Sequence, residues 1–170
     1  MKEQEKTKNY YDGIAPGYKE LYHEEQIKKI NLILPHLPTL TPNSITLDLG
    51  SGDGVLNKFI KDSKLISLDL SFELLKLNSN KEKLQACTTK LPIKSNSIDL
   101  IIAFTVIQDV GDTKIAIKEM NRILKEKGTL IISFLKNSTK KENILNNLNN
   151  YFKIGKQFEE EKDLILIYKK

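Results

Sequence analysis

The chain has 170 residues, of which 39% are hydrophobic and 29% are charged. This length fits one domain with a sizeable core, and the apolar content excludes a disordered chain. The polar segment 1–13 has no apolar h-region, and no apolar stretch approaches the length of a membrane span. A single cysteine excludes an internal disulfide. Together these features lead us to expect a cytoplasmic protein without a membrane span.

The net charge of +5 comes from 27 basic and 22 acidic residues, and Arg122 is the sole arginine. Arginine is the side chain that reads base edges and holds phosphates with paired hydrogen bonds. The positive charge is therefore interpreted as a solvated, lysine-rich surface rather than as an RNA-binding patch.

The first predicted elements lie before residue 40. Segment 1–8 is polar and is expected to fray. Apolar residues recur at helical spacing over 18–34, and Pro35 and Pro38 end that helix.

Short apolar runs then alternate with helical patterns. Ser71 and Asp112 stand at N-cap positions, and Thr139 and Glu142 have the spacing of a capping box. Helices are predicted over 55–61 and 72–77, after residue 112 and after residue 139. The predicted strands are 44–49, 65–70, 84–87, 98–104, 129–135, 152–158 and 164–168.

Strand–helix alternation at this spacing predicts parallel βαβ units with right-handed crossovers. The last two runs are separated by the charged turn EEEKD (159–163), so they are expected to form an antiparallel hairpin. The predicted α/β fold is a Rossmann-like, doubly wound, mostly parallel seven-stranded sheet. It has a C-terminal antiparallel hairpin and helices on both faces.

The glycine-rich segment LDLGSGDG (47–54) lies where the first core strand turns into the next element. In doubly wound sheets ligands bind beyond the carboxyl ends of the strands, and glycines allow the backbone to approach a ligand. Asp69 ends the second strand, nineteen residues after Gly50, where a carboxylate can accept both hydroxyls of a ribose. The pattern predicts a site for an adenosine-containing ligand; the alternative is a tight structural turn with Asp69 as a helix cap.

The glycines follow G-x-G-x-G, whereas the dinucleotide fingerprint is G-x-G-x-x-G. The acids Asp48 and Asp53 suit a cationic ligand without phosphates better than a pyrophosphate. S-adenosylmethionine carries a sulfonium and an ammonium group, and Asp48 is placed to balance the ammonium. A dinucleotide-dependent oxidoreductase is disfavoured by this spacing, by the terminal hairpin and by the missing Tyr-x-x-x-Lys pair.

Four ordered motifs, LDLGSGDG, LISLDLS, KLPIKSNSIDLIIAFTVIQDVGD and EMNRILKEKGTLIIS, resemble the class I S-adenosylmethionine-dependent methyltransferases. They are most similar to the broad small-molecule-type branch that includes the quinone-biosynthesis methyltransferases. The opening YYDGIAPGYKELY resembles the N-terminal cover helix of that branch. The resemblance implies one methyltransferase domain over 1–170, with a cover segment at 1–40 and a Rossmann-like core at 41–170.

The resemblance also implies which residues contact S-adenosylmethionine. The family usually carries an acidic residue at the position of Cys87, where it bonds the adenine amino group. Adenine recognition in this chain would therefore rest on the backbone of Thr88 and on apolar packing. The implied contacts are Asp48, Gly50, Ser51 and Gly52 at the methionine moiety, Asp69 at the ribose, Leu70, Cys87 and Thr88 at the adenine, Ala103 and Phe104 near the methionine end, and Tyr11 and Tyr18 as a cover.

Methyl transfer from a sulfonium releases a neutral thioether, so alignment and exclusion of water can supply most of the rate. The catalytic candidates are Gln108 and Asp109, where many relatives carry histidines. Asp109 can accept a proton or hold a cationic acceptor; the alternative is a helix cap. No metal is expected, because His23 and His36 lack paired ligand spacing.

The loop after the fourth strand lacks the N-P-P-Y or D-P-P-Y run that the family uses for many exocyclic amino groups of bases and for glutamine. Those acceptors are disfavoured, whereas ribose, ring positions and carboxylates stay open. We expect a small-molecule acceptor. The alternatives are an RNA or protein methyltransferase that depends on an activating protein subunit, and a non-catalytic protein that binds S-adenosylmethionine.

Overall fold

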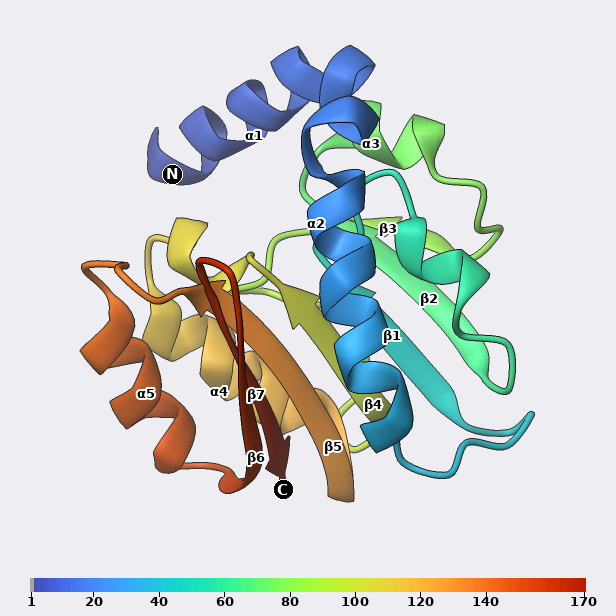
Figure 1. Cartoon of the computed structure of the whole chain (residues 1–170), viewed down its shortest axis with the longest axis vertical. Helices are drawn as coiled ribbons and strands as arrows, with labels where there is room; N and C mark the ends of the chain where they lie inside the picture. Colours follow the sequence, from blue (N-terminus) through green and yellow to red (C-terminus); the bar gives the residue numbers. More distant parts are fainter. Residues whose placement is uncertain (1) are drawn as a thin grey trace.

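Over residues 2–170, which the computed structural model describes, a seven-stranded sheet forms the centre of the molecule (Figure 1). Five strands run parallel and two C-terminal strands form an antiparallel pair, as predicted. The strands are β1 (Ile45–Leu49), β2 (Lys64–Asp69), β3 (Lys83–Gln85), β4 (Ile98–Phe104), β5 (Leu124–Leu135), β6 (Lys153–Glu160) and β7 (Asp163–Lys169).

The strand order is β3-β2-β1-β4-β5-β7-β6, and β1 pairs in parallel with both β2 and β4. The direction in which strands are added to the sheet therefore reverses next to β1. Such a switch point opens a crevice at the carboxyl ends of the strands. The topology thus places a ligand site beside the loop that follows β1.

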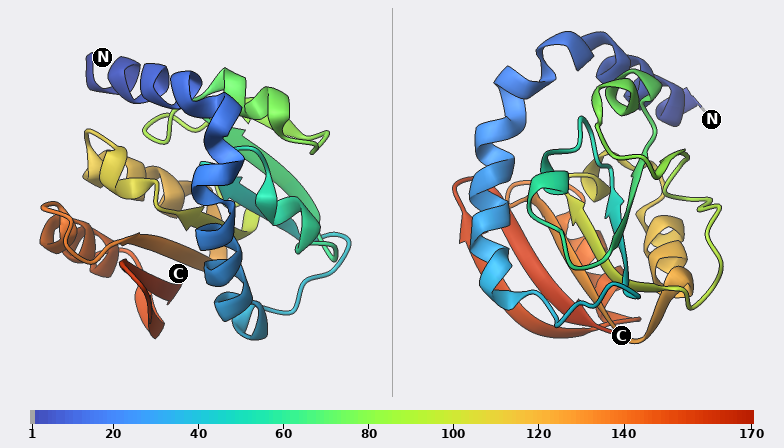
Figure 2. Two further views of the ribbon diagram at one scale, coloured as in Figure 1. Left: turned by 45° about the horizontal axis from the view of Figure 1, so that its top comes forward. Right: turned by 90° about the vertical axis from the view of Figure 1, so that its right-hand side faces the viewer.

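Helices cover both faces of this sheet (Figure 2). Within the described residues no helix combines the length and apolar character needed to cross a bilayer. The helices are α1 (Lys2–Ile14), α2 (Tyr18–Ile33), α3 (Phe72–Leu77), α4 (Thr113–Ile123) and α5 (Lys141–Asn149), with 3₁₀ turns at Ala15–Gly17, Leu34–His36, Val55–Lys58 and Ile107–Asp109.

Two apolar clusters fill the space between the sheet and its helices. Ile117 of α4 and Leu148 of α5 belong to one cluster, and Ile30 of α2 belongs to the other. The neighbours Ile101 and Ile102 of β4 belong to different clusters, because successive side chains of a strand point to opposite faces. Coverage on both sides explains why the central strands are continuous apolar runs in the sequence.

The N-terminal segment is helical, so the expectation that residues 1–8 would fray is wrong for its described part. Helix α1 begins at Lys2, and Met1 lies outside the described residues. No residue of 3–14 is fully buried, which explains why the sequence shows no apolar stripe there. Long-range polar contacts hold this helix instead: the Gln4 amide donates to Thr89 Oγ1 at 3.1 Å.

Predicted helix starts are confirmed at two positions and wrong at a third. Ser71 Oγ accepts the Leu74 N–H at 3.2 Å, and Asp112 Oδ1 accepts the N–H of Ile115 at 3.0 Å. The predicted capping box at 139–142 is absent, because α5 begins one residue later behind Lys140, which makes no side-chain cap bond. The helix expected over 55–61 is only the 3₁₀ turn at Val55–Lys58.

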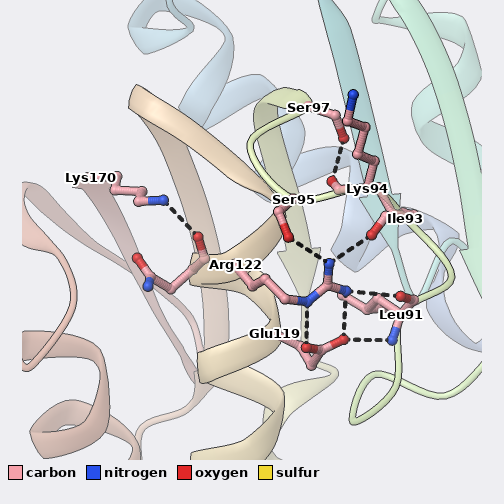
Figure 3. Close-up of polar contacts among 9 residues, drawn as sticks. Leu91, Ile93, Lys94, Ser95, Ser97, Glu119, Arg122 and Lys170 are labelled. Carbon is pink, nitrogen blue, oxygen red and sulfur yellow. Dashed lines mark hydrogen bonds and ion pairs between the residues drawn. The ribbon is translucent and has the colours of Figure 1, made fainter.

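Arg122, the sole arginine of the chain, has a structural role: its guanidinium makes hydrogen bonds within the protein (Figure 3). Arg122 of α4 donates two hydrogen bonds to the Glu119 carboxylate, at 2.7 and 2.8 Å. Its guanidinium also donates to the carbonyls of Leu91 at 2.9 Å and Ile93 at 2.8 Å. Arg122 therefore fastens α4 to the loop that precedes β4.

A buried lysine joins α2 to the tip of the β6–β7 hairpin. Lys29 is fully buried, and its Nζ lies 2.8 Å from a carboxylate oxygen of Glu25 and 2.8 Å from one of Asp163. Lys29 also donates to Thr105 Oγ1 at 2.6 Å, directly after β4. On the surface of the same helix, Lys28 pairs with Glu161 at 2.6 Å. The sequence interpretation of a solvated lysine surface does not hold at Lys29.

We expect the substitution Lys29→Ala to reduce the free energy of unfolding by about 3–5 kcal/mol, because it leaves buried carboxylates without their cation. Urea unfolding measures this loss. Lys28→Ala, one position earlier, is the matched control and should leave the urea midpoint nearly unchanged, since that pair is exposed. Equal losses in the two variants would show that the buried cluster has no special weight.

Candidate functional site

A cavity of about 420 Å³ lies at the carboxyl ends of the parallel strands, covered by residues of α1 and α2. Every parallel strand contributes to it: Gly50 follows β1, Asp69 ends β2, Ala86 follows β3, Phe104 ends β4 and Leu135 ends β5. This is the position that the strand order predicts for a ligand.

The glycine loop reaches the cavity because its backbone takes conformations that other residues avoid. Gly50 has φ +76° and Gly52 has φ +53°. A Cβ on Gly50 would overlap the Val106 side chain, and one on Gly52 would lie 3.0 Å from the Tyr18 ring. The loop is therefore packed tightly beneath α2 and against the loop after β4.

We expect Gly50→Ala to destabilise the protein by at least about 1–2 kcal/mol, the cost of a left-handed conformation with a side chain, with the Val106 overlap in addition. Thermal unfolding measures the loss. Gly13→Ala is the control: nothing lies within 4 Å of that position, which is in α1, so alanine should be neutral or slightly stabilising. A neutral Gly50→Ala would contradict the packing described for the loop.

Asp69 is buried at the edge of the cavity, and two backbone N–H groups hold its carboxylate. Gly52 N–H donates to one oxygen and Ser71 N–H to the other, both at 2.8 Å. Burial raises the pKa of Asp69, while these hydrogen bonds oppose the rise. A carboxylate has about four lone-pair positions, so two remain for a ligand. The helix-cap alternative is wrong, because Ser71 caps α3.

Asp48 lies in a small secondary cavity that shares Gly50, Tyr18 and Phe104 with the main one. Burial and the nearby charges of Asp69 and Asp53 raise the pKa of Asp48 to about 8. Ser51 borders the same small cavity. This end of the site therefore holds excess negative charge that a cation would relieve.

The raised pKa of Asp48 makes stability depend on pH. Between its ordinary value of 3.8 and about 8 the folded protein binds the extra proton, so this group lowers stability as the pH rises through that window. We expect Asp48→Asn to stabilise the protein more at pH 8.5 than at pH 5, as measured by urea unfolding. The exposed Asp62→Asn is the control and should give no such difference.

The cover over the cavity is fastened by polar side chains. Tyr11 OH donates to Asp109 Oδ2 at 2.8 Å. The Ser71 hydroxyl donates to the carboxylate of Asp12 at the end of α1. His23 Nε2 of α2 lies 2.6 Å from an oxygen of Asp53 in the glycine loop. His23 thus contacts the loop rather than solvent, a link that the sequence interpretation missed.

Four tyrosine rings line the underside of this cover. Tyr10 and Tyr11 are 5.2 Å apart between ring centroids, Tyr11 and Tyr18 are 6.5 Å apart, and Tyr18 and Tyr22 are 4.9 Å apart. The sequence interpretation included Tyr11 and Tyr18 and missed the other two. The four-residue spacing of Tyr18 and Tyr22, which puts both on one helix face, was the available signal.

The structure places most of the predicted site residues at the main cavity. Ala103 is an exception: it lies fully buried in the α4–α5 cluster, because alternation along β4 turns it away from its neighbour Phe104. Gln108 borders the cavity, but its amide oxygen accepts the Leu135 N–H at 2.8 Å. The predicted residues that line the main cavity are Tyr11, Tyr18, Gly50, Asp69, Leu70, Cys87, Thr88, Phe104, Gln108 and Asp109.

No group of three or more metal-ligating His, Cys, Asp or Glu side chains is found within residues 2–170. The lining instead combines aromatic rings, backbone groups and carboxylates. Such a site can bind a polar organic ligand of moderate size.

Comparison with known proteins identifies the class to which this site belongs. A family model described as a methyltransferase domain matches residues 47–132, just over half of the chain. The chain therefore belongs to this family, and its motifs and fold place it among the class I S-adenosylmethionine-dependent methyltransferases. An uncharacterized protein of Methanocaldococcus jannaschii is 36% identical over 153 residues, which cover 89% of this chain and 65% of that protein. The chain thus spans less than two thirds of that relative's length.

Solved structures share the fold at low sequence identity. The methyltransferase in a Haloferax volcanii complex with the activator Trm112 matches with a TM-score of 0.78, 16% identity, and coverage of 94% of this chain and 96% of that chain. The N-methyltransferase NodS of Bradyrhizobium japonicum, solved with S-adenosyl-l-homocysteine, matches with a TM-score of 0.72 and 14% identity, covering 87% of each chain.

Proposed function

We propose that this chain is a methyltransferase that binds S-adenosylmethionine and transfers its methyl group to a small molecule. The observation that carries the proposal is the Asp69 carboxylate, held by two backbone N–H groups at the edge of a covered cavity. Membership of the methyltransferase family supports the same cofactor.

The residues of the site fit this cofactor. Asp69 keeps two lone-pair positions for the ribose hydroxyls. Asp48 is buried beside the carboxylates of Asp69 and Asp53, which suits the cofactor's ammonium group. Leu70 and Thr88 line the cavity on the side of β2 and β3, where they can enclose the adenine. When bound, S-adenosylmethionine supplies a methyl group whose carbon–sulfur bond breaks, leaving the electron pair on sulfur, while the acceptor's lone pair forms the new bond.

The chain's own contribution to catalysis is positioning and exclusion of water. The tyrosines of α1 and α2 cover the cavity, and the bonds from Tyr11 and Asp12 to the core hold the cover closed. Correct alignment of two reactants in such an enclosed site is worth about 7–11 kcal/mol of the barrier. Asp109 is placed in the lining, where it can hold or deprotonate an acceptor.

The size of the cavity supports a small acceptor. Ligand pockets usually measure roughly 300–1,000 Å³, and this one, at about 420 Å³, lies near the lower end.

The cofactor assignment predicts that S-adenosylhomocysteine, the demethylated product, raises the melting temperature whereas NAD does not. We expect Asp69→Ala to weaken S-adenosylhomocysteine binding at least tenfold in isothermal titration calorimetry, because the ribose loses its acceptor. Asp62→Ala removes an exposed carboxylate and is the control, with unchanged affinity. Thermal melts establish that Asp69→Ala is folded, since Asp69 also bonds two backbone groups. Failure of the unmodified protein to bind would remove the assignment.

A second candidate function is a methyltransferase that acts on RNA or protein with an activating subunit. The observation in its favour is the fold match to the Haloferax volcanii methyltransferase bound to Trm112, which extends over 94% of this chain. Sedimentation of the purified chain with and without the Trm112 protein of that complex tests direct association. An unchanged sedimentation coefficient removes support for that activator.

A further inference from the structure

The charged groups of the cavity have the wrong sign for an anionic acceptor. Its lining carries three carboxylates, on Glu25, Asp69 and Asp109, and one lysine, Lys162. Two of the carboxylates are accounted for: Asp69 belongs to the ribose, and Glu25 has cations on both sides. Glu25 lies 2.8 Å from Lys29 and 2.7 Å from Lys162. The same pairing neutralises Lys162, so Asp109 carries the charge that is left.

Asp109 is only partly satisfied by the protein. Its Oδ2 accepts the hydrogen bond from Tyr11 OH, and its Oδ1 has no hydrogen-bond partner among residues 2–170. The nearest cationic influence is that of Lys140, which forms no ion pair with it in the described structure. A half-buried carboxylate that lines a cavity and has one unpaired oxygen is suited to bind a hydrogen-bond donor with positive charge.

The aromatic rings beside Asp109 favour the same kind of ligand. Tyr10, Tyr11 and Tyr22 line the cavity together with Asp109. The hydrogen bond with Tyr10, burial, and the charges of Glu25 and Asp109 raise the pKa of Tyr22 to about 12, so Tyr22 lines the same cavity as these carboxylates as a neutral phenol. The negative face of a tyrosine ring attracts ammonium ions.

We propose that the methyl acceptor is a small amine, bound as an ammonium ion between Asp109 and the tyrosine rings of α1 and α2. This proposal rests on the proposed methyltransferase function and names the substrate class for it. A carboxylate acceptor, which the motifs alone left open, would meet Asp109 with the same sign of charge, and the lysine among the described lining residues, Lys162, is already paired with Glu25.

The position of Asp109 also accounts for the proton that an ammonium acceptor must lose. An ammonium nitrogen has no lone pair, so it must lose one proton before it can form a bond to carbon. Asp109 Oδ1 accepts this proton, and the nitrogen becomes a neutral amine. Burial raises the pKa of Asp109, against the hydrogen bond from Tyr11, which makes the carboxylate a better proton acceptor.

The test compares ligands that share a phenethyl group and carry a cationic, an anionic or a neutral head group. Protein saturated with S-adenosylhomocysteine is titrated with phenethylamine, 3-phenylpropionate and 2-phenylethanol, and binding is followed by ligand-observed NMR. We expect phenethylamine to bind at least tenfold more tightly than 3-phenylpropionate, with 2-phenylethanol between them. Equal binding, or tighter binding of the acid, would overturn the amine assignment. Failure of S-adenosylhomocysteine to bind would instead overturn the methyltransferase function.

Two pairs of variants test whether Asp109 and Tyr22 are responsible for the preference for the amine. Asp109→Asn should lower phenethylamine affinity at least fivefold and remove the preference over the acid. Asp112→Asn is its control, because asparagine also caps helices and Asp112 does not line the cavity. If Asp109→Asn does not fold, Tyr22→Leu provides the second test: it should weaken the amine and leave the acid unchanged, whereas Tyr22→Phe keeps the ring and the amine affinity. Loss of both ligands in Tyr22→Leu would contradict the proposal.

Discussion

Two backbone N–H groups, those of Gly52 and Ser71, hold the Asp69 carboxylate in place, and the site is organised around this interaction. It joins the glycine loop after β1 to the start of α3 after β2, the two segments on either side of the crevice. Burial of Asp69 raises its pKa, and these two donors oppose that rise by stabilising the charged form. The same bonds that stabilise the charge aim its remaining lone pairs.

Three carboxylates at or beside the cavity, those of Asp69, Glu25 and Asp48, have different surroundings. Asp69 is stabilised by backbone amides and Glu25 by two lysines, whereas burial and the nearby carboxylates of Asp69 and Asp53 raise the pKa of Asp48 to about 8. The buried Lys29 links Glu25 to the core, because it also donates a hydrogen bond to Thr105. Thr105 is a β-branched residue that lines the cavity and has a φ of +58°.

The sequence was sufficient to predict the sheet, its direction and the glycine loop that borders the cavity, because these follow from apolar runs, glycines and one acidic residue at a fixed spacing. It was insufficient for α1, whose residues are not buried, and for Lys29, whose burial depends on Asp163 more than 130 positions away. Ala103 was assigned to the site from the family resemblance, but side-chain alternation decides which of two neighbours faces the cavity.

The attachment of α1 differs from that of the other long helices. Neither apolar cluster includes a residue of Lys2–Ile14, and its links to the core are hydrogen bonds such as Gln4 to Thr89 and Tyr11 to Asp109. Each such bond contributes only about 0.5–1.5 kcal/mol net. The first helix can therefore detach from the cavity while the sheet and its two packed faces stay intact, at a free-energy cost far below that of global unfolding.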